Sequence, residues 1–448
     1  MKEVCCVTIS LPNFVETALN KLNTAGYEAY VVGGCVRDTL LGREPMDWDI
    51  TTSALPEETI RVFSDYRVIP TGLQHGTVTV LIDDRPLEIT TYRIDGEYTD
   101  NRHPDKVEFT RNLREDLQRR DFTVNAIAYH PTQGIVDHFS GLADLSDGRI
   151  VCVGDPEKRF TEDALRILRA LRFSAQLGFP IEKMTAQAIH HLAPLLRNIA
   201  AERIQSELVK LLCGEQVKAV MLAFSDVIGI VLPEIVSMIG LEQINPYHYL
   251  TVYEHTVETI AAVSAKPHLR LTMLLHDSGK PACYTKDENG IDHFSGHPPV
   301  SAAIAEQAMS RLCFDRQTIN TVKTLVMHHD DVITDNDRVI KRLLNRIGAD
   351  SAHDLITVQK ADVIGQHPDK RDRLNQLEAI DKRIDELVRS AACFSLADLA
   401  VNGDDLQQLG YRVGRQLGDT LQTLLDAVID GDLPNERATL LNKAKEIM

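Results

Sequence analysis

Two aspartates separated by one residue stand near the start of the chain, in the stretch Asp47-Trp48-Asp49. The stretch is predicted as a β-strand, and because side chains alternate along a strand, Asp47 and Asp49 would project from the same face. Two carboxylates placed in this way can bridge two divalent ions, which lie about 3.5–4 Å apart when they stabilise the attacking and leaving oxygens of a phosphoryl displacement. Glu88, on another predicted strand, could supply a third carboxylate. The pattern predicts metal-assisted nucleotide transfer from a triphosphate, with Mg²⁺ as the cofactor.

A glycine turn precedes these aspartates, in the order strand, Gly33-Gly34, helix. Such a turn directs free backbone N–H groups at an anion, and Arg37 on the following helix adds a planar donor for phosphate oxygens. Gly34 and Arg37 are therefore predicted to bind phosphate. An Asp-x-Asp pair or a double glycine alone is usually only a turn, so the prediction depends on their order and close spacing.

A polar face follows on the predicted helix over 161–172, whose leucines recur at every third position on the other side. Asp163, Arg166 and Arg169 share this polar face. Cytosine and adenine both present an amino donor beside an unprotonated ring nitrogen, whereas uracil and guanine present a carbonyl beside a ring N–H. A carboxylate next to a guanidinium would therefore accept C and A and leave buried groups unpaired with U or G. The alternative is a solvated helix face capped by Thr161.

The elements that must position these groups change along the chain. A lead helix is expected over 11–25, with Ser10 as its N-cap and Gly26 as its end. Alternating short apolar runs then predict a compact α/β unit, with strands near 27–33, 47–52, 75–82 and 86–92 and helical pieces near 35–41 and 56–64. The stretch 93–105 is rich in turn formers and is predicted to be a flexible loop. Beyond about residue 155 the pattern is almost entirely helical.

Composition narrows the class of protein. The chain has 448 residues, enough for two to four domains, and 44% of them are hydrophobic. Lysine and arginine number 48 against 65 acidic residues, a net charge of −17, so no global positive field attracts a polyanion. The stretch 158–172 is an exception, with five basic and two acidic residues. No signal peptide, membrane-length apolar run or Cys-x-x-Cys pair stands in the sequence, which predicts a cytoplasmic protein with reduced thiols and no membrane partner.

The motifs together resemble a known family. The segment from Val32 to Gly42, followed by Asp47-Trp-Asp49, is similar to the signature of class II tRNA nucleotidyltransferases and bacterial poly(A) polymerases, members of the polymerase-β-like superfamily. Further similar segments are 119–126, 137–145, 162–166 and two stretches of the tail, 401–406 and 431–437. The resemblance implies a polymerase-β-like α/β head followed by an all-α neck, body, HD unit and tail. The implied boundaries are 1–24 for the lead helix, 25–150 for the head, 151–240 for the neck and body, 241–370 for the HD unit and 371–448 for a tRNA-binding tail.

The same resemblance assigns roles to single residues. It implies that Asp163 and Arg166 select the base, with Arg169 and Arg172 as further contacts to the nucleotide. Either Arg119 or Arg120 would contact the nucleotide, and Arg120 is favoured. The implied activity is addition of C, C and A to the 3′ end of tRNA from CTP and ATP, with the loop over 93–105 closing during the switch from C to A.

A separate chemistry is indicated by the histidines, ten of which lie between His248 and His367. Their order with the acidic residues resembles the HD superfamily of metal-dependent phosphohydrolases. Imidazoles with carboxylates suit a divalent metal ion that generates hydroxide from bound water. The implied ligands are His255, His276, Asp277 and Asp362. In addition, His297 and His328 could hold a second ion or contact phosphate, and Lys280 could bind a phosphate oxygen. The identity of the metal stays open, as does a purely structural role.

Three alternatives to CCA addition also stay open at this point. The first is a poly(A) or A-only adding enzyme, because the motifs overlap. The second is an RNA-end phosphohydrolase whose head mainly binds RNA, and the third is a non-catalytic tRNA-binding or chaperone-like protein. The oligomeric state does not follow from the sequence.

Overall fold

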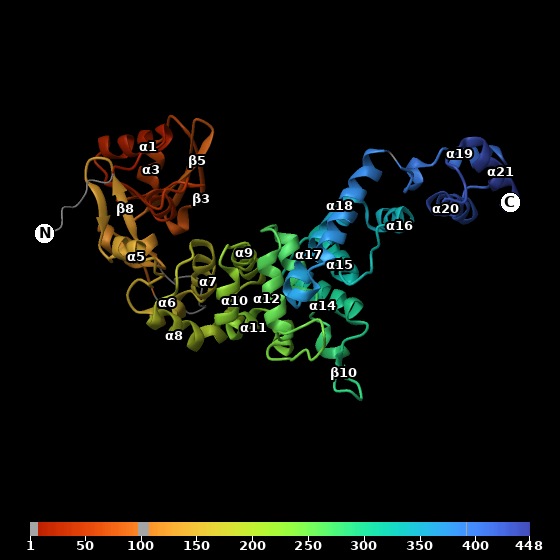
Figure 1. Ribbon diagram of the computed structural model, residues 1–448. Helices are drawn as coiled ribbons and strands as arrows, with labels where there is room; N and C mark the ends of the chain where they lie inside the picture. Colours follow the sequence, from red (N-terminus) through yellow and green to blue (C-terminus); the bar gives the residue numbers. More distant parts are fainter. Residues whose placement is uncertain (1–7, 97–106, 391) are drawn as a thin grey trace. The chain divides into compact units, whose positions relative to one another are not determined.

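The structure is a computed structural model that describes residues 8–96, 107–390 and 392–448. The chain divides into two compact units, Met1–Pro233 and Glu234–Met448 (Figure 1). The first unit contains a mixed β-sheet with helices around it and after it, and the second unit is almost entirely helical. The prediction of an α/β head followed by helices is therefore confirmed.

A seven-stranded sheet is the centre of the first unit, in the order β3-β4-β5-β2-β1-β8-β9. Its strands are β1 (Ala29–Val32), β2 (Asp49–Thr52), β3 (Arg67–Gly72), β4 (Thr77–Ile82), β5 (Arg85–Thr91), β8 (Ile127–His130) and β9 (Gly134–Asp137). Strands β2 and β5 run parallel, and the other neighbours are antiparallel. All four residues of β1 and of β8 are buried, as expected for central strands covered on both faces.

Short helices cover this sheet, namely α1 (Asn13–Thr24), α2 (Gly34–Leu40), α3 (Pro56–Val62), α4 (Leu113–Gln118) and α5 (Gly141–Asp147). Helices α1 and α3 contact each other and lie together beside the sheet (Figure 1). Helix α1 buries one apolar stripe that includes Val15, Leu19 and Leu22, which is why its amphipathic sequence folds here.

The first unit ends in a group of helices: α6 (Pro156–Glu162), α7 (Leu165–Leu177), α8 (Lys183–Leu192), α9 (Ala201–Leu212), α10 (Val217–Ala223) and α11 (Ser225–Val231). Helix α7 packs along α9. Its leucines Leu168 and Leu171 are fully buried, so the predicted apolar side of this segment is confirmed.

The second unit consists of α12 (Val252–Ala262), α13 (Pro267–Leu275), α14 (His297–Arg311), α15 (Arg316–His328), α16 (Asp337–Ile347), α17 (Ala349–Gly365), α18 (Arg373–Arg389), α19 (Gly403–Gln408), α20 (Arg415–Asp430) and α21 (Arg437–Ile447), with the two-residue strands β10 (Thr285–Lys286) and β11 (Asp292–His293). Helices α12, α13 and α17 contact one another. A glycine permits this close approach, because a Cβ on Gly365 would lie 2.9 Å from Nδ1 of His255.

Several local predictions differ from the structure. Helix α1 begins at Asn13 with Pro12, not Ser10, in the cap position. Strands β3, β8 and β9 were not predicted. The loop expected over 93–105 begins as strand β6 (Arg93–Asp95), which pairs with β7 (Val107–Phe109), and the part over 97–106 lies outside the described residues. Among the residues that the structure describes, no helix is long and apolar enough to cross a membrane.

Candidate active site and candidate metal centre

The acidic residues of the head meet at the start of β2. Asp49 is the first residue of this strand, and in the parallel pairing of β2 with β5 it lies opposite Glu88. The backbone register therefore puts two carboxylates from chain segments about 40 residues apart on adjacent strands. This juxtaposition brings together two of the three predicted catalytic acids.

Asp47 lies before strand β2 and not on it, which differs from the prediction. The strand does not include Asp47 or Trp48, so the expectation that Asp47 and Asp49 alternate along one strand is wrong. In the register of β2 and β5, Asp47 would stand opposite Pro86, and a proline has no N–H to donate to a ladder. Asp47 nevertheless acts on Asp49 electrostatically.

Charge and burial together determine how Asp49 titrates. Burial raises the pKa of Asp49 to about 6, opposed by the positive charge of Arg120 and assisted by the negative charges of Asp47 and Glu88. Three carboxylates that repel one another in a partly buried place are stabilised by a cation. The donor set thus fits hard divalent ions.

The glycine turn lies beside this cluster. Gly33 has φ 88°, a left-handed conformation that favours glycine, and a Cβ there would come within 3.1 Å of Nη1 of Arg120. Nε of Arg120 is buried and has no hydrogen-bond partner among the described residues. The glycine turn therefore leaves room for the guanidinium of Arg120, whose Nε–H has no acceptor among the described residues.

Arg119 and Arg120 differ in their surroundings. Arg119 donates from Nε to the buried carboxylate of Asp116 at 2.9 Å, whereas Arg120 lies 3.7 Å from that carboxylate and next to Gly33. Asp116 also accepts a hydrogen bond from Thr51 of β2 at 2.9 Å. This geometry favours Arg120 as the residue that faces a phosphate at the turn.

Arg37 is held by two neighbours. Its Nη1 donates to Oδ1 of Asn125 at 2.6 Å and its Nε donates to Asp38 at 2.8 Å. The guanidinium also stacks 5.0 Å from the centre of the Phe173 ring, a cation–π distance. Arg37 is thus held in one orientation next to Gly34, whose added Cβ would lie 3.6 Å from Nη2.

The predicted helix over 161–172 is two helices. Helix α6 ends at Glu162, and Asp163 has extended backbone angles, φ −136° and ψ 100°. At the break the Asp163 side chain accepts the backbone N–H of Leu165 at 3.1 Å, a local bond that competes with a continuous helix. Helix α7 starts at Leu165, so Asp163 lies before the helix and not on its polar face.

Asp163 and Arg166 each have a partner of their own. Arg203 on α9 donates to both oxygens of Asp163, from Nη1 at 3.3 Å and from Nη2 at 2.9 Å. Arg166 donates to Glu162 at 3.0 Å and to the backbone oxygen of Arg119 at 2.9 Å. The two residues predicted to read a base are therefore each held by an opposite charge, and Arg203 was not among the predicted residues.

Two further predicted contacts are embedded in ion pairs. Nε of Arg169 donates to Asp121 at 2.7 Å, and Nε of Arg172 lies 3.2 Å from the carboxylate of Glu207 on α9. Burial lowers the pKa of Arg172 to about 10 although Glu207 opposes the shift. Arg172 also lies 4.1 Å from the centre of the Phe173 ring. No signal in the sequence points to Glu207, because its role depends on the packing of α9 against α7.

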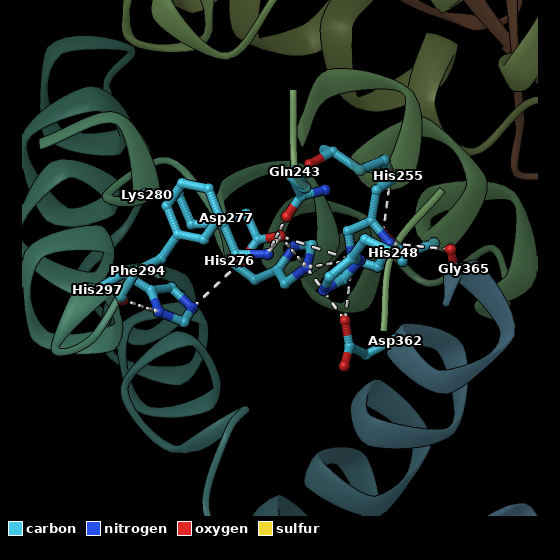
Figure 2. A network of polar contacts seen from close by, with 12 residues as sticks. Gln243, His248, His255, His276, Asp277, Lys280, Phe294, His297, Asp362 and Gly365 are labelled. Carbon is cyan, nitrogen blue, oxygen red and sulfur yellow. Dashed lines mark hydrogen bonds and ion pairs between the residues drawn. The ribbon is translucent and has the colours of Figure 1, made fainter. Parts of the chain in front are cut away.

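The predicted metal ligands of the second unit converge in the structure. Nε2 of His255 lies 3.0 Å from Asp362 and 3.4 Å from Nε2 of His276 (Figure 2). Oδ2 of Asp277 lies 3.2 Å from Nε2 of His276 and 3.5 Å from Nε2 of His255. All four residues are buried except for the edge of Asp362.

The backbone determines which nitrogen of each imidazole faces inward. Nδ1 of His255 lies 3.1 Å from the oxygen of Gly365, and Nδ1 of His276 lies 2.7 Å from the oxygen of Met273. Since a carbonyl only accepts, each Nδ1 carries a proton, and the Nε2 atoms point at each other and at the carboxylates. Burial would lower the pKa of His276, but Asp277 and Asp362 outweigh it and raise that pKa to about 10, so in the metal-free protein Nε2 of His276 is protonated too. A metal ion bound among these atoms would displace that proton, with the carbonyls orienting the ligands.

A second histidine pair faces the other oxygen of Asp277. Oδ1 of Asp277 lies 3.2 Å from Nε2 of His297 and 3.8 Å from Nε2 of His329. The prediction named His328, which instead turns to Asp331 at 2.8 Å. His329 takes the inner place because Nδ1 of its ring donates to the oxygen of Val326 at the end of α15. Burial lowers the pKa of His329 to about 3, which keeps the imidazole in the neutral form that ligates metals.

Lys280 and the surrounding cavity complete this centre. Nζ of Lys280 lies 2.7 Å from Asp277 and donates to Gln243 at 2.8 Å. Burial would raise the pKa of Asp277, but His276 and Lys280 outweigh it and hold that pKa well below its usual value. The centre opens into a cavity of about 600 Å³ that Lys370 and Arg373 also line. His248, which lines this cavity, and Gln243, which accepts the bond from Lys280, were not predicted from the sequence; Figure 2 shows both side chains beside the cluster.

Three sequence families match separate parts of the chain. Residues 29–151 match the poly A polymerase head domain, residues 178–238 match the RNA and SrmB-binding site of polymerase A, and residues 293–444 match domain 2 of tRNA nucleotidyltransferases. The first of these ranges contains the acidic cluster and the glycine turn.

Whole-chain relatives carry one name. The CCA-adding enzyme of Levilactobacillus brevis is 36% identical over 443 residues, which cover 96% of this chain and 98% of that enzyme. The CCA-adding enzyme of Leuconostoc mesenteroides is 56% identical over 198 residues, so that this match spans only about half of that relative, 49%, and 44% of this chain.

Solved structures agree with this assignment. The crystal structure of the Bacillus stearothermophilus CCA-adding enzyme in complex with CTP has a TM-score of 0.75 and 28% identity, and the match covers 98% of both chains. The Thermotoga maritima CCA-adding enzyme complexed with tRNA has a TM-score of 0.57 at 19% identity, which shows the shared fold. A nucleotidyltransferase of this kind requires a divalent metal ion. The chain belongs to the family of CCA-adding tRNA nucleotidyltransferases.

Proposed function

We propose that this protein adds C, C and A to the 3′ end of tRNA, using CTP and ATP and releasing pyrophosphate. The observation that carries the proposal is the pairing of Asp49 with Glu88, with Asp47 acting on the same carboxylate, in a chain that aligns with a CCA-adding enzyme over 96% of its length. A cluster of like charges beside a phosphate-binding turn suits a reaction whose substrate brings both metal ions and phosphates.

Asp47, Asp49 and Glu88 are the proposed ligands of two Mg²⁺ ions. When bound, such ions lower the pKa of the attacking hydroxyl and neutralise the leaving pyrophosphate. The backbone N–H of Gly34 and the side chains of Arg37 and Arg120 would bind and orient the triphosphate. The unused Nε donor of Arg120 and the fixed orientation of Arg37 support these roles.

Asp163 and Arg166 are the proposed readers of the base. The carboxylate would accept the amino hydrogen that cytosine and adenine share, and the guanidinium would donate to their unprotonated ring nitrogen. Arg169 and Arg172 are proposed as contacts to the rest of the nucleotide, for which their pairs with Asp121 and Glu207 must open. A cavity of about 1000 Å³, lined in part by Arg119 and Glu162, offers room beside these residues.

The test is incubation of the protein with tRNA that lacks all three terminal nucleotides, together with labelled CTP and ATP. Incorporation of two C and one A is expected, and loss of incorporation is expected for the variant Asp47→Ala/Asp49→Ala. Incorporation of A without C would instead identify a poly(A) or A-only adding enzyme. No incorporation at all would refute nucleotide transfer.

A second activity, hydrolysis of phosphate esters at RNA ends, is favoured by one observation. The Nε2 atoms of four buried imidazoles face the two oxygens of Asp277, beside a cavity lined by cationic side chains. We propose that His255, His276, Asp277 and Asp362 bind a divalent metal ion, with His297 and His329 positioned for a second one. Metal bound there would supply hydroxide near neutral pH.

Two double variants separate the two activities. Asp47→Ala/Asp49→Ala should lose nucleotide addition and keep phosphatase activity toward a chromogenic phosphomonoester and RNA with a 2′,3′-cyclic end. His276→Ala/Asp277→Ala should do the opposite. Loss of both activities in both variants would contradict two independent sites. The proposed cellular location, the cytoplasm, follows from the substrate tRNA and is testable by fractionation.

A further inference from the structure

The carboxylate of Asp163 is nearly saturated by donors of the chain itself. It accepts from Nη1 and Nη2 of Arg203 at 3.3 and 2.9 Å and from the backbone N–H of Leu165 at 3.1 Å. An ionised carboxylate offers about four acceptor positions, two on each oxygen. Oδ1 accepts two of these bonds and Oδ2 accepts one, so one position is left, on Oδ2.

This count matters because the bases differ in how many donors they present side by side. Cytosine and adenine offer one amino group beside a bare ring nitrogen. Guanine offers its N1–H and its 2-amino group as two adjacent donors, which match both oxygens of a free carboxylate. A carboxylate that presents one acceptor serves the amino group of C or A but cannot pair with guanine through both oxygens.

We propose that Arg203 is a positioning residue of base selection, which covers one edge of the Asp163 carboxylate and thereby excludes guanine. The inference rests on the proposed role of Asp163 as a reader of the base. Arg203 comes from α9, 40 residues away in the chain, and it contacts Asp163 as a two-pronged fork. Such a fork fixes both the position and the rotation of a carboxylate, which a single contact cannot do.

The surroundings argue against a purely structural role for the pair. The side chains of Arg203 and Asp163 are 27% and 18% exposed, and ion pairs in contact with solvent contribute little to stability. The backbone N–H at the start of α7, that of Leu165, already bonds to Asp163 without any contribution from Arg203. Arg166 is paired with Glu162. The contact of Arg203 with Asp163 is therefore not needed to keep Asp163 from pairing with Arg166.

The test compares Arg203→Met with the unchanged protein in single-nucleotide addition to tRNA. The kcat/KM for CTP, ATP, GTP and UTP would be measured separately. Removal of the Arg203 guanidinium frees the second edge of the Asp163 carboxylate. We therefore expect the ratio of kcat/KM for GTP to kcat/KM for CTP to rise about tenfold or more. The ratio of UTP to CTP should change less, because uracil presents one ring N–H. Arg203→Lys should give an intermediate GTP ratio, because an ammonium group spans one oxygen only.

Arg311→Met is the matched control, since Arg311 in the second unit also contacts both oxygens of a carboxylate, donating to Glu234 from Nη2 at 2.8 and 2.9 Å and from Nε at 3.3 Å. It should leave all four ratios unchanged. An unchanged GTP ratio in Arg203→Met, or an equal loss of kcat/KM for all four nucleotides, would overturn the inference. Asp163→Ala tests the underlying assignment: if this variant still selects C and A, then Asp163 does not read the base, whatever Arg203 does.

Discussion

Replacing Asp49 by asparagine should make the metal-free protein more stable while abolishing its catalysis. The substitution keeps the size of the side chain and removes a carboxylate that burial, Asp47 and Glu88 make costly to ionise. Arg120 offsets part of this cost but does not cancel it. The expected gain in stability therefore comes from removing a buried, repelled negative charge, which catalysis needs.

The magnitude follows from the pKa. In the folded protein the pKa of Asp49 rises from the ordinary value of 3.8 to about 6. At ~1.4 kcal/mol for each tenfold change in proton affinity, the ionised carboxylate destabilises the fold by about 3 kcal/mol. Because the pKa is raised on folding, this cost is fully present above pH 6, shrinks as the pH falls through 6, and vanishes below about pH 4.

The assay is thermal and urea unfolding in EDTA at pH 8 and at pH 4.5. Asp49→Asn should unfold later than the unchanged protein at pH 8, and at pH 4.5 the difference should fall to about a third, roughly 1 kcal/mol. Added Mg²⁺ should stabilise the unchanged protein at pH 8 and have a smaller effect on the variant. Asp65→Asn is the control of opposite sign, because Lys21 lowers the pKa of Asp65 and the substitution removes a favourable pair. Destabilisation by Asp49→Asn at pH 8, or a gain that does not depend on pH, would refute the reasoning.

Three other outcomes are expected. Leu168→Ala, at a fully buried position of α7, should lower the free energy of unfolding by about 2–5 kcal/mol in urea titrations, whereas a loss below 1 kcal/mol would mean that this core relaxes freely. Glu207→Ala leaves the buried guanidinium of Arg172 without its carboxylate and should cost about 3–5 kcal/mol, with Glu207→Gln costing less; equal costs would show that charge is unimportant there. The affinity for tRNA should depend only modestly on salt in filter-binding assays, since roughly 0.9 of a counterion is released per neutralised phosphate and the net charge of −17 leaves only local basic stretches to contact phosphates. A steep log–log slope would contradict this.

Strands and helices were predicted well from the sequence where a single hydrophobic pattern determines the element. The strand that begins at Asp49 and the strand that contains Glu88 follow from short apolar runs bounded by turn residues. The adjacency of these two strands did not follow, because it depends on a parallel pairing between segments that the β3–β4 hairpin separates. The hydrophobic periodicity of a segment predicts one strand or helix, whereas the register of a strand also depends on the strand with which it pairs.

Predictions failed where a side chain interrupts a pattern. The leucine spacing begins only at Leu165 and gives no sign of the break at Asp163, so the segment was predicted as one helix although the chain is extended at Asp163 and a new helix starts after it. The choice of His328 over His329 failed by one position, because the last turn of α15 decides which ring faces inward. The partner of Asp163, Arg203, lies too far along the chain for any local pattern to indicate it.

The strand order of the head also determines when its active site can form. Asp49 obtains its neighbour only after β5 has returned to β2, and β1, which carries the glycine turn, is flanked on its other side by β8 at residues 127–130. During synthesis on the ribosome the turn and Asp49 are made early, whereas β5 follows about 40 residues after Asp49 and β8 about 80 residues after it. Contacts of such long sequence separation form late and slowly. A chain that ends before β8 therefore carries all three acidic residues without the two strands, β8 and β9, that complete the sheet beside β1, and we expect such an unfinished chain to be unable to act on nucleotides.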